Sequence, residues 1–355
     1  MEKEMIVHGG EYFDMNKISL DFSVNINPLG CPYKIEQDDL ERLIAVYPDR
    51  ECRALRQKLA IKKAIDYHNV FIGNGASEVI TLLCRALDID LALIFEPTFS
   101  GYKRALTVEG INIENGNLSE KDDFELKRES IEIVQDFCEK HKSKEYSKAV
   151  FLCNPNNPTG SCIPKEIVHE ILKKCMEAGC YLVVDESFMD FVYDSSLFSS
   201  MQFLEEYDNL FVISSFTKIF AMPGIRLGAL YGKEEIVDKM MKLQPEWSVS
   251  GLALEYGLKL LDKDDFVSET KKLIQKEGEY LRAEFNKLGI KTYPSETNFL
   301  LCKHNSKDIW NELANRGMLV RRCDNFVTLD NNYFRVAVRK HEDNKKLINE
   351  LSEII

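Results

Sequence analysis

Short apolar runs alternate with segments of helical period through the middle of the chain. Four runs rich in Val, Ile and Phe predict buried strands at residues 91–99, 149–157, 181–188 and 210–216. Between them lie mixed segments such as 164–179, where apolar residues recur at helical spacing. Continuous apolar strands separated by helices are typical of a mostly parallel sheet with helices on both faces. The pattern therefore predicts an α/β fold.

The C-terminal third of the chain has a different pattern, typical of a smaller α+β domain. Helices and strands are predicted to alternate there, at 264–290, 297–303, 306–317, 333–338 and from 341 onward. The Pro- and Gly-rich N-terminal segment shows no regular period and is expected to pack with this small domain. We therefore expect three parts, an arm at 1–40, a large domain at 41–245 and a small domain at 246–355.

Composition narrows the class of protein. The 355 residues are 45% hydrophobic and 29% charged, as in a soluble globular protein. The net charge of −12 argues against nucleic acid or an anionic membrane as a partner. No run approaches a membrane span, and the N-terminus lacks the apolar core of a signal peptide, so we expect a cytoplasmic protein. None of the ten cysteines forms a CxxC pair, so we expect reduced thiols and no metal site.

Groups that bind anions are expected at the ends of the predicted strands. In GNGASE (73–78), a glycine-rich turn opens a helix whose free N–H groups attract an anion, although Ser and Glu there are also ordinary capping residues. In SSFTKIFAMPGIRLG (214–228), Ser215 and Thr217 alternate around Phe216, so both hydroxyls can face one side. Arg226 follows them and can bind a phosphate with its forked guanidinium.

Three other side chains belong to the same edge of the sheet. Lys218 lies within the second of these segments, between Thr217 and Arg226, and a lysine in a desolvated site can form a Schiff base with an aldehyde. Asp185 ends a buried strand, where a carboxylate needs a cation or donor as partner. Asn157, in NPNNPTG (154–160), lies in a rigid turn after another strand. A lysine, a phosphate cup and a buried acid together describe a site for pyridoxal 5′-phosphate (PLP).

The motifs GNGASE, PTF, NPNNPTG, DES, SFTK and PGIRLG follow one another in an order that resembles the fold type I, PLP-dependent enzymes of the class I/II aminotransferase superfamily. The resemblance covers nearly the whole chain. It implies that Lys218 carries the cofactor, that Asp185 keeps the pyridine nitrogen protonated, that Asn157 bonds the ring O3′ and that Phe99 stacks on the ring. The implied phosphate ligands are Gly75, Ala76, Ser77, Ser215, Thr217 and Arg226, together with Tyr47 from a neighbouring subunit of a homodimer.

Further segments resemble one branch of that superfamily. HGGEYF (8–13), DFSVNINPLGCP (21–32), DESFMDF (185–191) and QPEWSVSGLA (244–253) look like the threonine-phosphate decarboxylases of cobalamin biosynthesis. The related histidinol-phosphate aminotransferases have a tyrosine where this chain has Phe188. The resemblance implies decarboxylation of O-phospho-L-threonine to (R)-1-amino-2-propanol phosphate. Two alternatives stay open, a phosphate-substrate aminotransferase and an O-phospho-L-serine decarboxylase. A non-enzymatic regulator is disfavoured because Lys218 is present and no DNA-binding segment is evident.

The residues expected to bind a small phosphorylated amino acid are drawn from both ends of the chain. Arg335 in YFRVAV resembles the arginine that grips the substrate carboxylate in the superfamily. Candidates for the substrate phosphate are His8, Arg321, Arg322 and Arg339. Since neighbouring residues of a strand point to opposite faces, we expect one of Arg321 and Arg322 to face the site.

Overall fold

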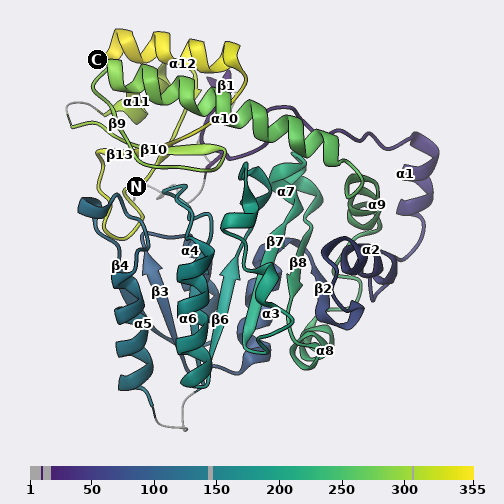
Figure 1. The fold of residues 1–355 in the computed structure, drawn as a ribbon. Coiled ribbons are helices and arrows are strands. Elements are labelled where there is room, and N and C mark those ends of the chain that lie inside the picture. Colours follow the sequence, from purple (N-terminus) through teal and green to yellow (C-terminus); the bar gives the residue numbers. More distant parts are fainter. Residues whose placement is uncertain (1–8, 11–16, 143–146, 306–307) are drawn as a thin grey trace, which may run out of the picture.

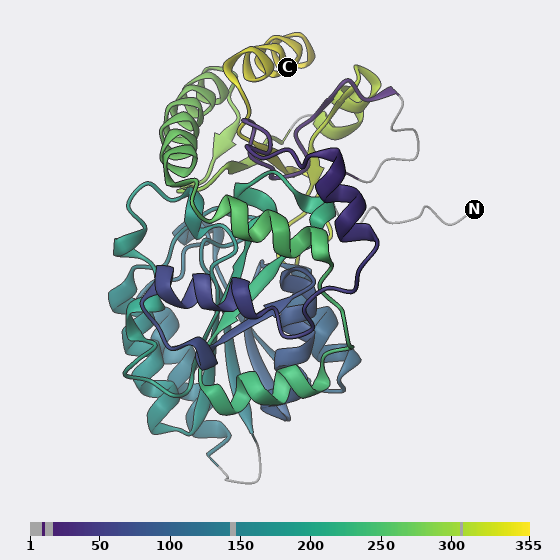
Figure 2. The same ribbon diagram turned by 90° about the vertical axis from the view of Figure 1, so that its right-hand side faces the viewer.

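A central sheet and a smaller sheet organise the chain. The computed structural model describes residues 9–10, 17–142, 147–305 and 308–355. The larger sheet occupies the lower part of Figure 1, and the smaller sheet lies above it under the C-terminal helices. Figure 2 shows the same stacking from a second side. None of the described helices is long and apolar enough to cross a membrane.

The central sheet has seven strands in the order β2-β8-β7-β6-β5-β3-β4. Among these described strands, β8 alone runs antiparallel to its neighbours. The α/β fold with a mostly parallel sheet, predicted from the apolar runs, is thereby confirmed. The strands are β2 (Val70–Gly73), β3 (Leu91–Glu96), β4 (Asn112–Asn117), β5 (Lys148–Cys153), β6 (Cys180–Asp185), β7 (Leu210–Ser215) and β8 (Gly228–Tyr231).

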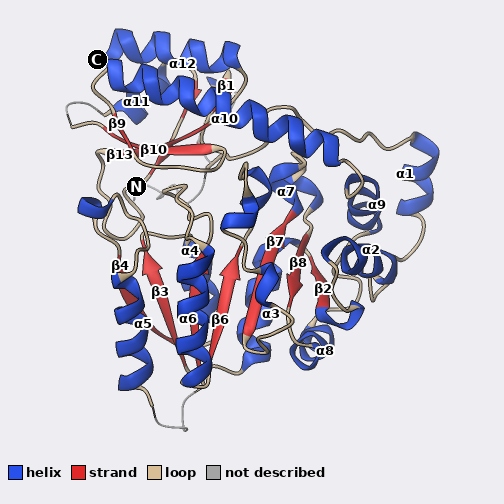
Figure 3. Cartoon of the chain, in the orientation of Figure 1, coloured by secondary structure: helices blue, strands red, loops and turns tan. Residues whose placement is uncertain are grey.

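Helices cover both faces of this sheet (Figure 3), which is why its strands are apolar on both sides. In β5, Val150 and Leu152 pack in one core cluster, and the alternating Ala149 and Phe151 pack in the other. The first cluster includes residues of α2 (Arg53–Lys63), α5 (Glu129–Lys140) and α6 (Lys165–Glu177). The second includes residues of α3 (Gly75–Leu87), α4 (Ser100–Val108) and α8 (Glu234–Leu243).

The smaller sheet has four antiparallel strands in the order β12-β13-β10-β9. They are β9 (Lys291–Thr292), β10 (Phe299–Lys303), β12 (Arg321–Arg322) and β13 (Tyr333–Ala337). The helices α10 (Asp264–Lys287), α11 (Ile309–Asn315) and α12 (His341–Ile354) belong to this part of the structure. Beside it, β1 (Leu20–Asp21) pairs with β11 (Met318–Leu319), which brings the N-terminal segment to the small sheet. The predicted domain boundaries stay a prediction.

The remaining elements are short. The helices α1 (Gln37–Ile44) and α9 (Gly251–Leu260) contact each other, and α7 (Phe216–Ile219) follows β7 directly. Six 3₁₀ turns complete the described structure: η2 (Tyr67–Asn69), η3 (Glu120–Asp122), η4 (Met189–Phe191), η5 (Ser195–Leu197), η6 (Met201–Phe203) and η7 (Pro223–Ile225).

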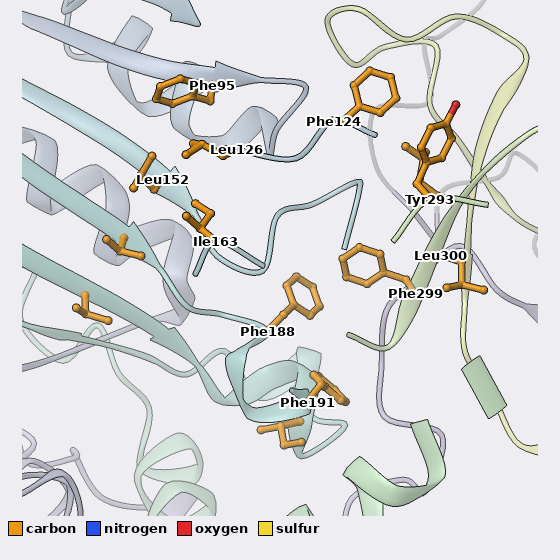
Figure 4. Close-up of a cluster of buried hydrophobic side chains, with 14 of the residues drawn as sticks. Phe95, Phe124, Leu126, Leu152, Ile163, Phe188, Phe191, Tyr293, Phe299 and Leu300 are labelled. Carbon is orange, nitrogen blue, oxygen red and sulfur yellow. The ribbon is translucent and has the colours of Figure 1, made fainter. Parts of the chain in front are cut away.

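One apolar cluster passes from the central sheet to the small sheet. In Figure 4, Phe188 from the loop after β6 faces Phe299 of β10. The two rings meet edge to face, with centroids 5.1 Å apart. Because this core is shared, the loops at the C-terminal ends of the central strands and the strands of the small sheet are held in a fixed relation. The predicted strands run past the observed ends into these loops.

Candidate active site

A cavity of about 250 Å³ lies at the C-terminal ends of β5, β6 and β7 and is bounded on the other side by the small sheet. In open α/β sheets, binding sites lie at this edge of the strands. The structure brings eleven of the residues expected in the site into the cavity wall: Ala76, Ser77, Phe99, Asn157, Asp185, Ser215, Thr217, Lys218, Arg226, Arg321 and Arg335.

One end of the cavity is suited to a phosphate group. The helix α3 begins at Gly75, so the N–H groups of its first turn have no partner within the helix. Gly75 has a φ of +78°, and a Cβ on it would collide with the guanidinium of Arg226. The hydroxyls of Ser215 and Thr217 lie 2.8 Å apart and therefore face the same side. A cation, hydroxyl donors and a helix N-terminus thus converge where only a glycine leaves room.

Lys218 lies in α7, directly after β7, and lines the cavity. Burial lowers the pKa of its ammonium to about 8, and the charges of Arg335 and Arg226 act in the same direction. The neutral amine, which is the nucleophilic form, is therefore far more abundant near neutral pH than in an exposed lysine.

Asp185 is the last residue of β6 and is buried at the cavity wall. Its Oδ2 accepts a hydrogen bond from the Tyr102 hydroxyl at 2.7 Å, and its Oδ1 accepts one from the Ser187 N–H at 2.9 Å. Burial raises the pKa of the carboxyl group, and these donors oppose that rise. A buried carboxylate with neutral hydrogen-bond partners is well placed to meet a cationic group of a ligand.

Two aromatic residues and an amide complete the wall. Phe99 precedes α4 and meets Tyr102 edge to face, with ring centroids 5.6 Å apart. Phe188 also lines the cavity, where its ring offers no hydroxyl to a ligand. Asn157 accepts a hydrogen bond at Oδ1 from the guanidinium of Arg335. Asn157 therefore links the loop after β5 to the small sheet.

Two arginines of the small sheet reach the cavity together. Arg321 and Arg335 are direct partners across the β12–β13 pair, so their side chains lie on the same face. They are 4% and 6% exposed. Arg335 donates to Asn157 and to the backbone carbonyl of Ser23, which are neutral acceptors. Burial lowers the pKa of Arg335 to about 9, and the charge of Arg321 also lowers it. An anion between the two guanidiniums would relieve both effects.

The sequence reasoning missed the contribution of the segment after β1. Ser23, Val24 and Asn25 line the cavity, as does Phe326 from the loop after β12. The Oδ1 of Asn25 and the Nε of Arg335 are buried and have no hydrogen-bond partner among the described residues. Buried polar atoms that lack a protein partner usually form a hydrogen bond with water or with a ligand. The segment DFSVNINPLGCP (21–32) resembles the decarboxylase branch of the superfamily, but no local sequence pattern placed Asn25 at the site.

Four of the expected residues that the structure describes do not line the cavity: Gly75, Arg322, Arg339 and Tyr47. Gly75 lies against the guanidinium of Arg226. Arg322 points away on its two-residue strand and pairs with Asp324. Arg339 pairs with Asp343 at 3.0 Å and donates to the carbonyl of Asp21. Tyr47 is 78% exposed and packs against Trp247. A fifth expected residue, His8, lies outside the described residues.

This set of residues fits PLP. The helix N-terminus, the hydroxyls and Arg226 suit its phosphate, Asp185 suits its ring nitrogen and Lys218 suits its aldehyde. When bound, PLP supplies an electron sink for the electron pair released at a substrate Cα. The model of the aminotransferase class I and II family matches residues 17–351. The chain belongs to this family and is a PLP-dependent enzyme of fold type I.

The names of individual relatives give two different activities, decarboxylation and transamination. The chain is 31% identical over 342 residues to a threonine-phosphate decarboxylase of Salmonella typhimurium, covering 95% of this chain and 91% of the relative. It is 30% identical over 361 residues to a histidinol-phosphate aminotransferase of Caldanaerobacter subterraneus, covering 98% and 97%. The crystal structure of the histidinol-phosphate aminotransferase from Clostridium acetobutylicum matches with a TM-score of 0.84 and 30% identity, covering 94% of this chain and 98% of that one.

The lowered pKa of Lys218 predicts how cofactor uptake depends on pH. Only the neutral amine attacks an aldehyde, so the rate at which the apoprotein takes up PLP should rise about tenfold per pH unit below pH 8. Above a pH of about 8 the rate should level off, because Lys218 is then mostly neutral. Stopped-flow absorbance of the bound cofactor measures this rate. A rate that keeps rising up to pH 10 would show an ordinary lysine and contradict the desolvated site.

Proposed function

We propose that this enzyme decarboxylates O-phospho-L-threonine to (R)-1-amino-2-propanol phosphate, a step of cobalamin biosynthesis. The observation that carries the proposal is the buried pair Arg321 and Arg335 in the cavity that holds Lys218 and Asp185. Two cations side by side suit a substrate with two anionic groups, a carboxylate and a phosphate. The name of the Salmonella relative supports the same reaction.

In this proposal, each residue of the site has a separate role. Gly75, Ala76, Ser77, Ser215, Thr217 and Arg226 hold the cofactor phosphate. Asp185 pairs with the ring nitrogen, Asn157 with the ring oxygen, and Phe99 covers the ring face. Lys218 holds the cofactor before the substrate arrives and afterwards delivers a proton. Arg335 binds the substrate carboxylate and Arg321 binds the substrate phosphate.

The position of the carboxylate selects decarboxylation over transamination. Bound PLP would supply the electron sink for the pair released when a bond at Cα breaks. Arg335 and Arg321 would hold the two anionic groups so that the Cα–carboxylate bond is the one placed for cleavage, and carbon dioxide would then leave without its bonding pair. Lys218 then supplies the proton that replaces the carboxylate. An aminotransferase would hold the Cα–H bond in that position.

Product analysis tests the proposal. The PLP-loaded enzyme is incubated with O-phospho-L-threonine in the absence of a keto acid, and the products are followed by NMR. Catalytic formation of aminopropanol phosphate is expected. If the cofactor is instead converted once to its amine and a keto acid appears, the enzyme is an aminotransferase, and histidinol phosphate is the substrate to try next. Parallel incubation with O-phospho-L-serine measures how far the substrate methyl group matters, an effect expected to lie between about 10- and 200-fold.

Conservative replacement of the two arginines should separate their roles. Arg335→Lys loses the forked grip on a carboxylate, so KM should rise at least about tenfold for both the phosphorylated substrate and its unphosphorylated analogue. Arg321→Lys should raise KM about tenfold for the phosphorylated substrate only. Steady-state kinetics with both compounds measure the difference. Arg322→Lys, next in the chain but outside the cavity wall, is the matched control, and an equal effect of Arg322→Lys would contradict the assignment.

We further propose that two copies of the chain pair to form a homodimer with shared active sites. Several large apolar side chains are exposed: Ile44, Val46, Tyr47, Leu243 and Trp247. Tyr47 packs against Trp247 with ring centroids 4.7 Å apart, so at least these two lie together on the surface. Exposed apolar residues that gather in this way are typical of protein interfaces. In this dimer Tyr47 binds the cofactor phosphate of the neighbouring subunit.

Mixed dimers test the shared site. Neither Lys218→Ala nor Tyr47→Ala should support normal turnover by itself. A dimer with one chain of each kind combines an intact Lys218 with an intact Tyr47 from its neighbour, so it should regain one working site and about half the activity of the parent. Activity after mixing and subunit exchange measures this. Lys218→Ala mixed with Asp185→Asn, two residues of the same cavity, should not recover. A failure of the first mixture to recover would place Tyr47 outside the neighbour's site.

A further inference from the structure

Three cysteines gather at the opposite end of β6 from the candidate active site. Cys180 begins β6, whereas Asp185 ends it. Cys138 belongs to the last turn of α5, and Cys175 belongs to α6. All three side chains are buried, and their sulfur atoms lie within 4.8 Å of one another. The triad therefore comes from three different elements.

The spacing of the sulfurs suits a metal ion. With Zn–S bonds of about 2.3 Å, thiolates around one ion stand about 3.8–4.0 Å apart. Three sulfurs within 4.8 Å of one another can reach this arrangement with small side-chain movements. All ten cysteines are free thiols, so no disulfide occupies the triad. Thiolate sulfur selects soft cations, in particular Zn²⁺ and Cu⁺.

A neighbouring cavity gives an ion access to the triad, and a neighbouring lysine supplies positive charge. Cys138 lines a cavity of about 630 Å³ that includes Lys148, Lys174 and Gly179 in its wall. This cavity gives an ion a way in and leaves space for a water molecule as a further ligand. Lys148 is buried and donates from Nζ to the carbonyl of His141, the residue just beyond α5. A Zn²⁺ ion with three thiolates carries a charge of −1, which the ammonium of Lys148 offsets.

We propose that Cys138, Cys175 and Cys180 form a binding site for one soft cation, Zn²⁺ or Cu⁺, through three thiolate sulfurs. Binding replaces the S–H protons, so up to three protons are released to solvent for each ion bound. No electron is transferred, and no oxidant is needed. The ion would join the C-terminal half of α5 to α6 and to the start of β6. This place is at the opposite end of β6 from the candidate active site.

Metal titration of the reduced, PLP-loaded enzyme tests the site. Cd²⁺ serves as the first probe because its bonds to thiolates absorb in the ultraviolet, and Zn²⁺ and Cu⁺ are then tested by competition. We expect one ion per chain, three fewer cysteines reacting with a thiol reagent, and a thermal unfolding midpoint that rises with free metal. Cys175→Ser and Cys138→Ser should each weaken binding by at least about tenfold. Cys84→Ser, a buried cysteine outside the triad, should bind as the parent does.

Other outcomes would overturn the proposal. Binding that persists in both triad variants, or that exceeds one ion per chain without thiol protection, would mean adventitious binding at the surface. If the parent enzyme binds no ion and mild oxidation joins two of the three cysteines, the triad is a redox pair rather than a metal site. Since thiol protection is read on the parent enzyme itself, the proposal can fail even if Cys175→Ser does not fold.

Discussion

Replacing Lys218 by alanine should abolish turnover and remove the absorbance band of lysine-bound cofactor. Lys218 is the amine that lines the cavity, and its pKa is lowered to about 8 by desolvation. The variant loses the group that holds the cofactor aldehyde and also the group that delivers a proton to Cα. Proton transfer alone contributes about 10²–10⁴-fold to rate, so the combined loss should exceed that range. The absorbance spectrum and the rate of carbon dioxide release measure the two effects.

Two variants make this experiment specific. Lys218→Arg keeps a positive charge in the cavity but cannot attack an aldehyde at neutral pH, so it should be as inactive as Lys218→Ala. Lys165→Ala removes a half-buried lysine that donates to the Ser196 carbonyl outside the cavity, and it should behave as the parent enzyme does. Turnover by Lys218→Ala above the background of free PLP would refute the assignment of this lysine.

Replacing Asp185 by asparagine should lower kcat by about 10²–10³-fold while the cofactor stays bound. The amide keeps the shape of the side chain and can still accept the hydrogen bond from Tyr102. It removes the negative charge that would keep the ring nitrogen protonated, and with it the strength of the electron sink. Steady-state kinetics measure kcat, and the retained absorbance of lysine-bound PLP shows that binding survives.

The neighbouring acid provides the matched control. Glu186 is also buried, but it accepts hydrogen bonds from Ser199 and Ser200 and does not line the cavity. Glu186→Gln should therefore affect stability more than kcat. An intermediate variant, Tyr102→Phe, removes one donor to Asp185 and should have a smaller effect than Asp185→Asn. If Asp185→Asn and Glu186→Gln change kcat equally, Asp185 has no special relation to the cofactor.

The identity of residue 188 does not by itself distinguish the two activities that the names of the relatives give. In the structure Phe188 lines the cavity and packs against Phe299, so the same ring that lines the cavity also joins the two sheets. A tyrosine at this place would add a hydroxyl to the cavity. In the proposed reaction, the orientation of the substrate therefore rests on Arg321 and Arg335 rather than on this ring alone.

The sequence by itself determined the central sheet and the cofactor end of the site. The strands at the middle of the chain are apolar on both faces because helices cover both, so an uninterrupted run of Val, Ile and Phe is a local signal. Asp185, Ser215 and Lys218 could be placed together for the same reason, since the ends of parallel strands meet at one edge. The strand ends were less well predicted, because apolar side chains continue into loops such as that of Phe188.

Only the tertiary structure decided which residues reach the end of the cavity that the small sheet bounds. Arg321 rather than Arg322 faces it, because the pairing of β12 with β13 sets Arg321 opposite Arg335. Asn25 reaches it because β1 pairs with β11 beside the small sheet. The cysteine triad also depends on packing, of α5 and α6 against the start of β6. Contacts between residues far apart in the chain are fixed by register and packing, which no local spacing of residue types records.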